Sequence, residues 1–438
     1  PKGLSSTTLI NAIEVSPHDP NTVYLAINDY KTNDFTPHVF KTTDGGKSWK
    51  RIVNGIQDEH FTRVVREDPK RKDLLYLGTE SGLYISFNGG EQWMPFLSNL
   101  PVTPIMDLKV HQNDLIAATG GRAFWILDDL SPLHYQGDQL SSSDVFLLKP
   151  EDAIRSDYVQ NKKAAKQFLG VNPPHGALIH FAVNKLSDDA ELKLEIYNEA
   201  NKLIRTLSTK AEKEGDKITV SKGLNRVLWD LGNHSPKRPD GLLAGFGEGA
   251  YRAVPGNYKV KLTYGDKVLE ETFAVLGDPR YNVPTTAFVE QNQILEGVNT
   301  SLAEIYQTVD KLRLVRSQVS LVKEVLKNSN GSDELIAYSD KISKRSEELE
   351  NLLVQPQQKT FQDVINFENK LDNHFIHLNG LVNDATPPVT NGQKQRYMDL
   401  QKQWQTVKSE IDTFMKSDVK AYNDKLKMQE VTLIGFMD

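Results

Sequence analysis

The first third of the chain alternates short apolar runs with polar turns, which is the pattern of antiparallel β-strands. The runs form three similar units whose strand candidates come in the same order, and the third unit has no clear fourth strand. These candidates are 9–15, 23–28, 39–41 and 49–53, then 62–65, 74–78, 82–86 and 92–96, and finally 105–110, 115–118 and 123–127. We therefore predict three small antiparallel sheets, which are the repeating element of a β-propeller.

Two turns, each between the third and fourth strand of its unit, share one pattern. KTTDGGKSW at 41–49 and SFNGGEQW at 86–93 hold a short polar side chain, two glycines and a tryptophan in the same order. Such a side chain accepts backbone N–H groups, and glycine tolerates positive φ. Asn88 follows Asp44 by 44 residues, a spacing typical of propeller blades. We assign a structural rather than a catalytic role to Thr42, Asp44, Gly46, Trp49, Ser86, Asn88, Gly90 and Trp93.

Three sheets are too few for a closed propeller, because natural ones have about four to eight blades. An open ring would leave a sheet edge uncovered, and such edges promote aggregation. We therefore expect this chain to be the C-terminal part of a longer protein. The missing blades would lie upstream in the same precursor or on another chain.

In the middle of the chain, apolar and polar residues still alternate with the period of two that is typical of strands. Residues 136–174 are expected to form a connector with one short strand at 145–148. A β-sandwich is expected to follow over 175–278, with Trp229 in its core. Its strand candidates are 178–183, 192–197, 227–230, 258–263 and 272–276.

From Pro284 onward the apolar spacing alternates between three and four residues, which predicts helices with one buried stripe. The first helix spans roughly 40 residues and would be about 60 Å long. It is expected to end at 328–331, and further helices are expected at 335–353, 361–381 and 397–422. Short loops between them favour an antiparallel four-helix bundle in up-down-up-down order. EVTLIGF, in the last dozen residues, is expected to be a short strand.

Composition narrows the classes of partner. The 438 residues carry a net charge of −6, which argues against nucleic acid and against a polybasic membrane anchor. The basic run PKRK at 69–72 is interpreted as a solvated loop between strands. No apolar run approaches the ~20 residues of a membrane span. Cysteine is absent, which excludes disulfides and thiolate metal sites.

TTDGGKSW and SFNGGEQW resemble Asp-box (BNR) repeats, which occur in sialidases, sortilin-like propellers and xyloglucan-degrading propellers. The stretches RVVREDPKRKDLLYLGTESGLYISFNGGEQW and LPVTPIMDLKVHQNDLIAATGGRAFWILDDLSP resemble exported bacterial proteins labelled sortilin-like or BNR-repeat "glycosyl hydrolase". Two departures are Asn88 in place of aspartate and a third unit that keeps only ILDD. In that group a sandwich and a helical tail follow the propeller, so the resemblance covers the whole chain.

The resemblance implies a multidomain protein, mainly β with an α tail, that is exported to the periplasm, cell surface or exterior. GLNRVLWDLGN and VPGNYKVKLTYGDKV resemble immunoglobulin-like modules. The expected division is the last three Asp-box propeller blades at 1–135, a connector at 136–174, an immunoglobulin-like β-sandwich at 175–278 and a four-helix bundle at 279–438.

Glycoside hydrolysis needs two carboxyl groups about 5 to 10 Å apart, whereas sialidases use a tyrosine and an arginine cluster. Arg63, Arg66 and Glu67 in the second unit are candidates for such a site. Arg63 and Arg66 would face opposite sides of a regular strand, and their spacing matches no sialidase pattern. Ion pairs at the edges or between blades are the alternative explanation.

GGRAFWILDD in the third unit supplies the other candidates. The glycines allow close backbone approach, and Arg122 and Trp125 could line a sugar or peptide site with Asp128. Asp129 follows as a further carboxylate. In the alternative interpretation this is the last blade, with Arg122 paired to a neighbour and Trp125 in the core.

Other patterns carry no cofactor or metal. GGKS at 45–48 lacks the first glycine of a phosphate loop and lies in a hairpin, and GFGEG at 245–249 lacks a following helix. His175 with His180, and His374 with His377, have no further ligand pattern beside them. We therefore expect no metal site and no cofactor.

Two functions remain open. The chain could belong to a protein that binds carbohydrate or peptide on the propeller face. Alternatively, it could belong to a glycoside hydrolase of the sialidase or xyloglucanase type, whose catalytic carboxylates lie mostly in upstream blades.

Overall fold

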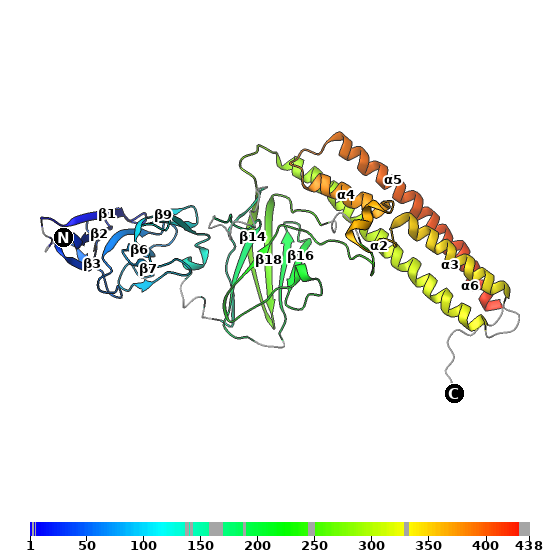
Figure 1. The fold of residues 1–438 in the computed structure, drawn as a ribbon, viewed down its shortest axis with the longest axis horizontal. Helices are drawn as coiled ribbons and strands as arrows, with labels where there is room; N and C mark the ends of the chain where they lie inside the picture. Colours follow the sequence, from blue (N-terminus) through cyan, green and yellow to red (C-terminus); the bar gives the residue numbers. More distant parts are fainter. Residues whose placement is uncertain are drawn as a thin grey trace, which may run out of the picture.

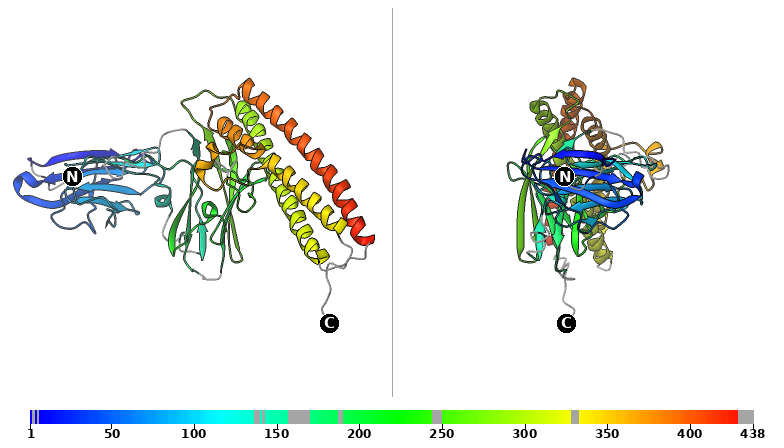
Figure 2. Two further views of the ribbon diagram at one scale, coloured as in Figure 1. Left: turned by 45° about the vertical axis from the view of Figure 1, so that its right-hand side comes forward. Right: turned by 90° about the vertical axis from the view of Figure 1, so that its left-hand side faces the viewer.

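The computed structural model describes residues 1, 4, 6–135, 140, 143–156, 170–186, 190–243, 250–327 and 333–428. The molecule is elongated, with three small sheets at one end, a pair of larger sheets in the middle and the helices at the other end (Figure 1). Two further views show the same succession (Figure 2). The prediction of a mainly β protein with a C-terminal helical region is confirmed.

The three small sheets follow the three predicted units. The first two have four strands and the third has three, all antiparallel and in chain order. Their strands are β1 (Leu9–Val15), β2 (Val23–Asp29), β3 (Asp34–Thr42) and β4 (Lys50–Arg51), then β5 (Thr62–Glu67), β6 (Leu75–Thr79), β7 (Gly82–Ser86) and β8 (Met94–Pro95), and finally β9 (Ile105–His111), β10 (Asp114–Thr119) and β11 (Phe124–Leu127).

The sheets bury their apolar faces against one another. Tyr24 and Val39 of the first sheet share a core with Leu77 and Trp93 of the second. On its other face the second sheet packs against the third. That core includes Val64, Tyr76, Ile85, Leu108, Leu115 and Ala117. Since alternate residues of each strand serve the two faces, the period-2 pattern dictates this stacking.

The stacked sheets have two ends, which we call the near end and the far end. The near end holds the β1–β2, β5–β6 and β9–β10 turns and the turns at 42–49 and 86–93. The far end holds the β2–β3, β6–β7 and β10–β11 connections. Polar contacts align the first two sheets: Asn28 donates to the Thr62 carbonyl at the far end, and His18 contacts the Asp68 carbonyl at the near end.

The middle region consists of two sheets with Trp229 buried between them at 1% exposure. One sheet has the order β12-β14-β17 and the other β13-β19-β18-β15-β16. The strands are β12 (Val145–Leu147), β13 (Ala153–Arg155), β14 (Ala177–Val183), β15 (Leu192–Asn198), β16 (Leu203–Ser208), β17 (Gly223–Trp229), β18 (Gly256–Tyr264) and β19 (Lys267–Gly277).

Two strands of this region come from the segment assigned to a connector, 136–174. β12 pairs with β14, and β13 pairs in parallel with β19, so the segment contributes to both sheets. β12 agrees with the short strand predicted at 145–148, whereas β13 was not predicted, because three residues leave too little alternation for a sequence pattern to reveal. The connector therefore helps to fasten the small sheets to the middle region.

The helical region contains two long continuous helical segments and a third segment in which two helices follow one another with an interruption between them. Its elements are α2 (Thr285–Lys327), α3 (Asp333–Leu353), the short 3-10 helix η5 (Phe361–Ile365), α4 (Leu371–Asn383), α5 (Asn391–Thr413), the π-helical segment η6 (Phe414–Val419) and α6 (Lys420–Met428). The two continuous segments are α2 and α5–η6–α6, and α3 and α4 form the interrupted one. Helices α5 and α6 continue one another through the π-helical turns. The predicted third helix at 361–381 is wrong in its first half, where the capping box at Thr360 opens only η5.

The expected up-down-up-down order is also wrong. Arg313 of α2 pairs with Glu350 of α3, and Lys323 pairs with Asp340, so α3 is antiparallel to α2. Helix α4 is antiparallel to α2 as well, because Gln291 near the start of α2 donates to the Val382 carbonyl near the end of α4.

The last helical segment, which begins with α5, runs parallel to α2. Lys394 pairs with Glu290, and Lys408 with Glu304, which makes α5 parallel to α2. The chain between α3 and α4 thus continues in one direction instead of reversing. Among the described residues, a cross-section of the region therefore contains three helices, which are α2, either α3 or α4, and α5 or its continuation, instead of the four that were predicted.

Some predicted features lie outside the described residues. These are the loop GFGEG at 245–249, the helix end at 328–331 and nearly all of the C-terminal strand candidate. Within the described part of the chain, no helix is both long enough and apolar enough to cross a lipid bilayer.

Candidate functional site

The turn at 42–49 is held by one hydroxyl and one carboxylate. The Thr42 hydroxyl donates to Asp44 at 2.7 Å and accepts the Gly46 N–H at 3.0 Å. Asp44 also accepts the backbone N–H and the hydroxyl of Ser48. These hydrogen bonds, with those from Ser48 first, lower the pKa of Asp44. The carboxylate is therefore fully engaged in shaping the turn.

The turn at 86–93 repeats this geometry with an amide. Ser86 donates to Asn88 at 3.0 Å and accepts the Gly90 N–H at 2.9 Å, while Asn88 accepts the Gln92 N–H at 3.0 Å. One oxygen serves both contacts, which explains why asparagine can replace aspartate here. The Trp93 indole donates to the Ile52 carbonyl of the first sheet and so links the two sheets.

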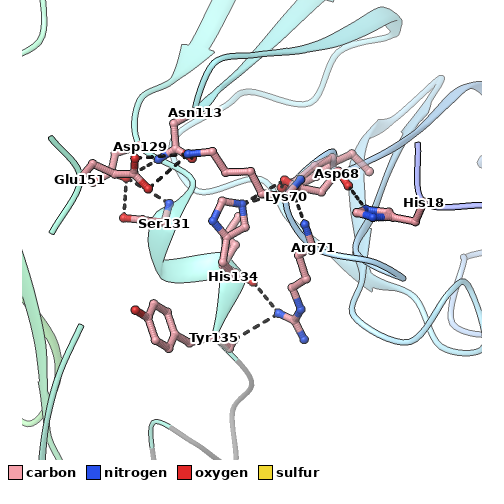
Figure 3. Close-up of polar contacts among 12 residues, drawn as sticks. His18, Asp68, Lys70, Arg71, Asn113, Asp129, Ser131, His134, Tyr135 and Glu151 are labelled. Atoms are coloured by element: carbon pink, nitrogen blue, oxygen red, sulfur yellow. Dashed lines mark hydrogen bonds and ion pairs between the residues drawn. The ribbon is translucent and has the colours of Figure 1, made fainter. Parts of the chain in front are cut away.

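At the near end, Asp68 ties the β5–β6 turn to the segment that follows β11, and its exposure is 0% (Figure 3). Its carboxylate accepts the Tyr76 hydroxyl at 2.8 Å and the backbone N–H groups of Lys70 and Arg71, and it contacts His134 at 3.2 Å. Burial alone would raise the pKa of Asp68, but these hydrogen bonds outweigh burial and lower it.

Further contacts extend this joint. Lys70 donates to Asn113 and pairs with Glu151, and Asp129 accepts from Asn113 (Figure 3). Asp129 also lies 3.4 Å from His180 of β14. A cavity of about 450 Å³ beside them is lined by both acidic and basic groups. Because the polar groups that line it are largely paired with one another, we interpret the near end as a structural joint.

The structure separates the residues that the sequence proposed as one site. Arg122 lies exposed in the β10–β11 connection at the far end, whereas Asp128 follows β11 at the near end. Trp125 packs into the core between the second and third sheets, and its indole N–H donates to the Arg122 carbonyl. Burial and repulsion by Asp114 raise the pKa of Asp128. Arg122 and Asp128 therefore belong to opposite ends.

The candidates of the second unit separate in the same way. Arg66 joins all three sheets, since it pairs with Glu14 of β1 and with Asp107 and the Leu108 carbonyl of β9. Glu67 lies at the near end of β5, where it accepts the Asp73 backbone N–H. Arg63 lies at the far end and pairs with Glu80 at 2.6 Å.

At the far end, Arg63 belongs to an aromatic platform, which we define as Tyr30, Phe35, Phe61 and Arg63. The Tyr30 and Phe61 rings stack with centroids 5.2 Å apart and planes inclined by 17°, and Phe35 approaches Phe61 at 6.1 Å. The Arg63 guanidinium lies 5.1 Å from the centre of the Phe61 ring. Phe61 is buried, while Tyr30 and Phe35 are 36% and 42% exposed. The platform therefore offers aromatic surface to solvent.

Polar groups surround the platform. Glu80 holds the Arg63 guanidinium, and its backbone N–H donates to the Phe61 carbonyl, so the second sheet fixes the Phe61 ring and the guanidinium together. Asp34 precedes Phe35 and accepts the hydroxyl and backbone N–H of Thr36. Those hydrogen bonds, followed by the one from His38, lower the pKa of Asp34 to about 2. The far end thus combines exposed rings with fixed charges.

Sequence reasoning found only Arg63 of this platform. Tyr30 lies in the β2–β3 connection, Phe35 near the start of β3 and Phe61 just before β5. The first two rings are therefore 26 to 31 residues from Phe61 and meet it only through sheet stacking. A possible signal was the pair of aromatics in a connection that is otherwise polar, NDYKTNDF at 28–35.

Comparison with known proteins gives a partial likeness. No family model matches the chain. A stretch of 95 residues is 30% identical to the xyloglucanase Xgh74A of Acetivibrio thermocellus. The match covers 19% of this chain and 11% of that enzyme, so the chain spans about a tenth of the length of this relative.

Likeness to solved structures is weak. A GH74 enzyme of Niastella koreensis is 12% identical, with a TM-score of 0.24 over 61% of this chain and 46% of that chain. YCF48 bound to D1 peptide is 11% identical, with a TM-score of 0.22 over 61% and 67%. An ancestral GH74 enzyme is 15% identical, with a TM-score of 0.24 over 62% and 37%. At these scores the likeness carries no argument about this chain.

Proposed function

We propose that this chain is the C-terminal part of an exported propeller protein that binds carbohydrate at the far end of its sheets. The observation that carries this proposal is the aromatic platform. Sugar rings present an apolar face that packs on aromatic rings, while their hydroxyls bond to fixed charged groups. Tyr30 and Phe35 supply the rings, and Arg63 with Glu80 supplies the charges.

The partial match to a xyloglucanase supports a carbohydrate ligand. The two turns support the propeller assignment, because their shared hydroxyl, carboxyl or amide, and paired glycines agree with Asp-box repeats. We assign the middle region to an immunoglobulin-like sandwich on the same resemblance. Export also rests on that resemblance.

Further blades are part of the proposal, and two uncovered apolar faces support them. On the outer face of the first sheet, Ile13 and Val15 are 63% and 54% exposed. On the outer face of the third sheet, Met106, Phe124 and Ile126 are 49%, 75% and 58% exposed. Exposed apolar faces of this kind usually pack against another element or partner. We propose that additional sheets of the same kind cover them and close the ring.

The test is binding of xyloglucan and other polysaccharides to the full-length protein, with the variants Tyr30→Ala and Phe35→Ala. Tyr281→Ala is the matched control, because it removes a tyrosine that is 51% exposed at a distance from the platform. We expect both platform variants to lose about tenfold or more in affinity, while the control binds like the unchanged protein. Equal binding by all variants would refute a site at the platform.

A glycoside hydrolase is the second candidate, favoured by the match to a xyloglucanase. The carboxylates at the platform are engaged, Glu80 by Arg63 and Asp34 by Thr36 and His38. Catalytic carboxylates would therefore lie mostly in the additional blades. Release of reducing sugar by the full-length protein, and not by this chain alone, would establish hydrolysis; binding without release would exclude it for the polysaccharides used.

A further inference from the structure

Three potential metal ligands meet in the hairpin of β2 and β3 at the far end. Asp29 ends β2, and Asp34 begins β3 directly opposite it. His38 lies four residues further along β3, so Asp34, Thr36 and His38 share one face of that strand. The strand register therefore brings two carboxylates and one imidazole together.

The distances match a coordination sphere. One donor atom from each of Asp29, Asp34 and His38 lies within 4.8 Å of the other two. The Asp34 Oδ2 and His38 Nε2 atoms are 3.0 Å apart. Donors bound at about 2.1 Å lie about 3.4 Å apart in a tetrahedral sphere, and about 3.0 Å (adjacent) or 4.2 Å (opposite) apart in an octahedral one. The 4.8 Å limit is somewhat longer than these spacings. One ion could therefore reach all three donors with small side-chain movements.

An orphaned oxygen is the independent sign of a ligand. Asp29 Oδ2 accepts the Thr8 hydroxyl at 3.0 Å. Asp29 Oδ1 is enclosed and has no hydrogen-bond partner within the part of the chain that the structure describes. An enclosed acceptor without a partner costs about 1–3 kcal/mol, and more when it is charged. A cation would satisfy this oxygen.

The neighbouring groups orient the other ligands. Thr36 donates its hydroxyl and its backbone N–H to Asp34 Oδ1, which leaves Oδ2 directed at His38. Such outer contacts fix the geometry of metal ligands. A simple ion pair between Asp34 and His38 is the alternative, but it accounts for only one of the two carboxylates.

We propose that Asp29, Asp34 and His38 bind a divalent transition-metal ion. A mixed set of carboxylates and imidazole suits Mn²⁺ and Zn²⁺, and the general order of affinities favours Zn²⁺. Tyr30 follows Asp29 and Phe35 follows Asp34, so the ion would fix the β2–β3 hairpin that carries two rings of the platform. The inference stands whether or not the platform binds carbohydrate.

The test is calorimetric titration of chelator-treated protein, this chain and the full-length form, with Zn²⁺ and with Mn²⁺. We expect one bound ion per chain and a higher melting temperature. Asp29→Asn and His38→Ala should each weaken binding at least about tenfold. His111→Ala, which removes an exposed histidine at the near end, should leave it unchanged.

The result separates the proposal from the ion-pair alternative. If Asp34 and His38 form only an ion pair, no ion will bind, and that result would overturn the proposal. Metal binding that Asp29→Asn leaves unchanged would overturn it as well, because the ion would then lie elsewhere. Circular dichroism of each variant shows whether it is folded. Manganese electron paramagnetic resonance of Asp34→Asn provides a second readout, in which loss of the bound signal supports the site and its persistence contradicts it.

Discussion

The two ends of the stacked sheets are built from the same strands but differ in what they contact: the near end meets the middle region, and the far end exposes aromatic rings. At the near end, the buried carboxylate of Asp68 has donors from Tyr76, from His134 and from two backbone N–H groups. At the far end, Asp29 keeps an enclosed oxygen without a partner, and Tyr30 and Phe35 expose their rings. The near end also has two buried atoms without a hydrogen bond within the described residues, Glu67 Oε2 and the Tyr24 hydroxyl. The exposed rings, rather than the pairing alone, therefore distinguish the far end as a place for a ligand.

The largest effect on stability is expected from Asp68→Ala. Removing this carboxylate leaves the Tyr76 hydroxyl and two backbone N–H groups unpaired, which should lower the unfolding free energy by about 3–5 kcal/mol. Urea denaturation followed by tryptophan fluorescence measures this loss. Asp19→Ala is the matched control, since Asp19 also precedes a proline in the first turn of its sheet but is not buried in a joint, and it should cost much less. Similar losses in both variants would contradict the special role of the joint.

The pKa of Asp68 is lowered, so its stabilisation is present above the unfolded pKa and is lost as the pH falls through the folded pKa. Asp372 in the helical region should behave in the opposite way. It is 2% exposed, and burial raises its pKa to about 7 despite nearby Arg238. Its protonated form is stabilised in the folded state, and that stabilisation is lost as the pH rises from about 4 to 7.

Asp372→Asn should therefore remove a fall in stability of up to about 4 kcal/mol between these pH values. Denaturation monitored by circular dichroism at 222 nm at several pH values tests this. Asp399→Asn, at an exposed position of α5, should keep the pH dependence of the unchanged protein. If the unfolding free energy of Asp372→Asn still falls between these pH values, burial of this carboxyl is not the cause of the fall.

A smaller effect is expected within the near end itself. Ser86 is fully buried and holds Asn88 and the Gly90 N–H, so Ser86→Ala should cost about 1–2 kcal/mol. Ser48 is exposed at the end of the other turn, and Ser48→Ala should cost clearly less. Thermal melting of the two variants side by side distinguishes them. A larger loss of stability for Ser48→Ala than for Ser86→Ala would contradict the prediction that the buried Ser86 hydroxyl contributes more to its turn.

The smallest effect on stability is expected at the far end. Tyr30→Ala removes a half-exposed ring that stacks on Phe61, and the unfolding free energy should fall by under about 1 kcal/mol. The same substitution should reduce carbohydrate binding about tenfold. A variant that melts far below the unchanged protein would show that the far end, too, is mainly structural.

The sequence predicted most strands and the long helices because their periods of two and about 3.5 residues persist over enough positions. β1 and β7 match the predicted bounds, and α2 starts at Thr285, one residue after the expected change of period. The directions of the helices relative to one another were not predictable in the same way. The link between α3 and α4 has turn-like residues but does not reverse the chain, and only contacts such as Gln291 to the Val382 carbonyl reveal this.

The candidate site was predicted in only one residue, Arg63. The aromatic rings come from the ends of strands and from connections in two sheets, and no local period marks such residues. The sequence analysis expected no metal site, because neither pair of histidines has a further ligand pattern beside it. Asp34, Thr36 and His38 at alternate positions of a strand, opposite Asp29, form a pattern that hairpin register makes visible.

The two uncovered faces have a consequence for the chain in isolation. The face with Ile13 and Val15 and the face with Phe124 and Ile126 differ from each other and lie on opposite sides of the stack. A contact between them in two copies would be heterologous, and each new copy would offer a fresh face to the next. Unless the rotation between copies happens to close a ring, the isolated chain would polymerise into open fibres, with growth that depends steeply on concentration.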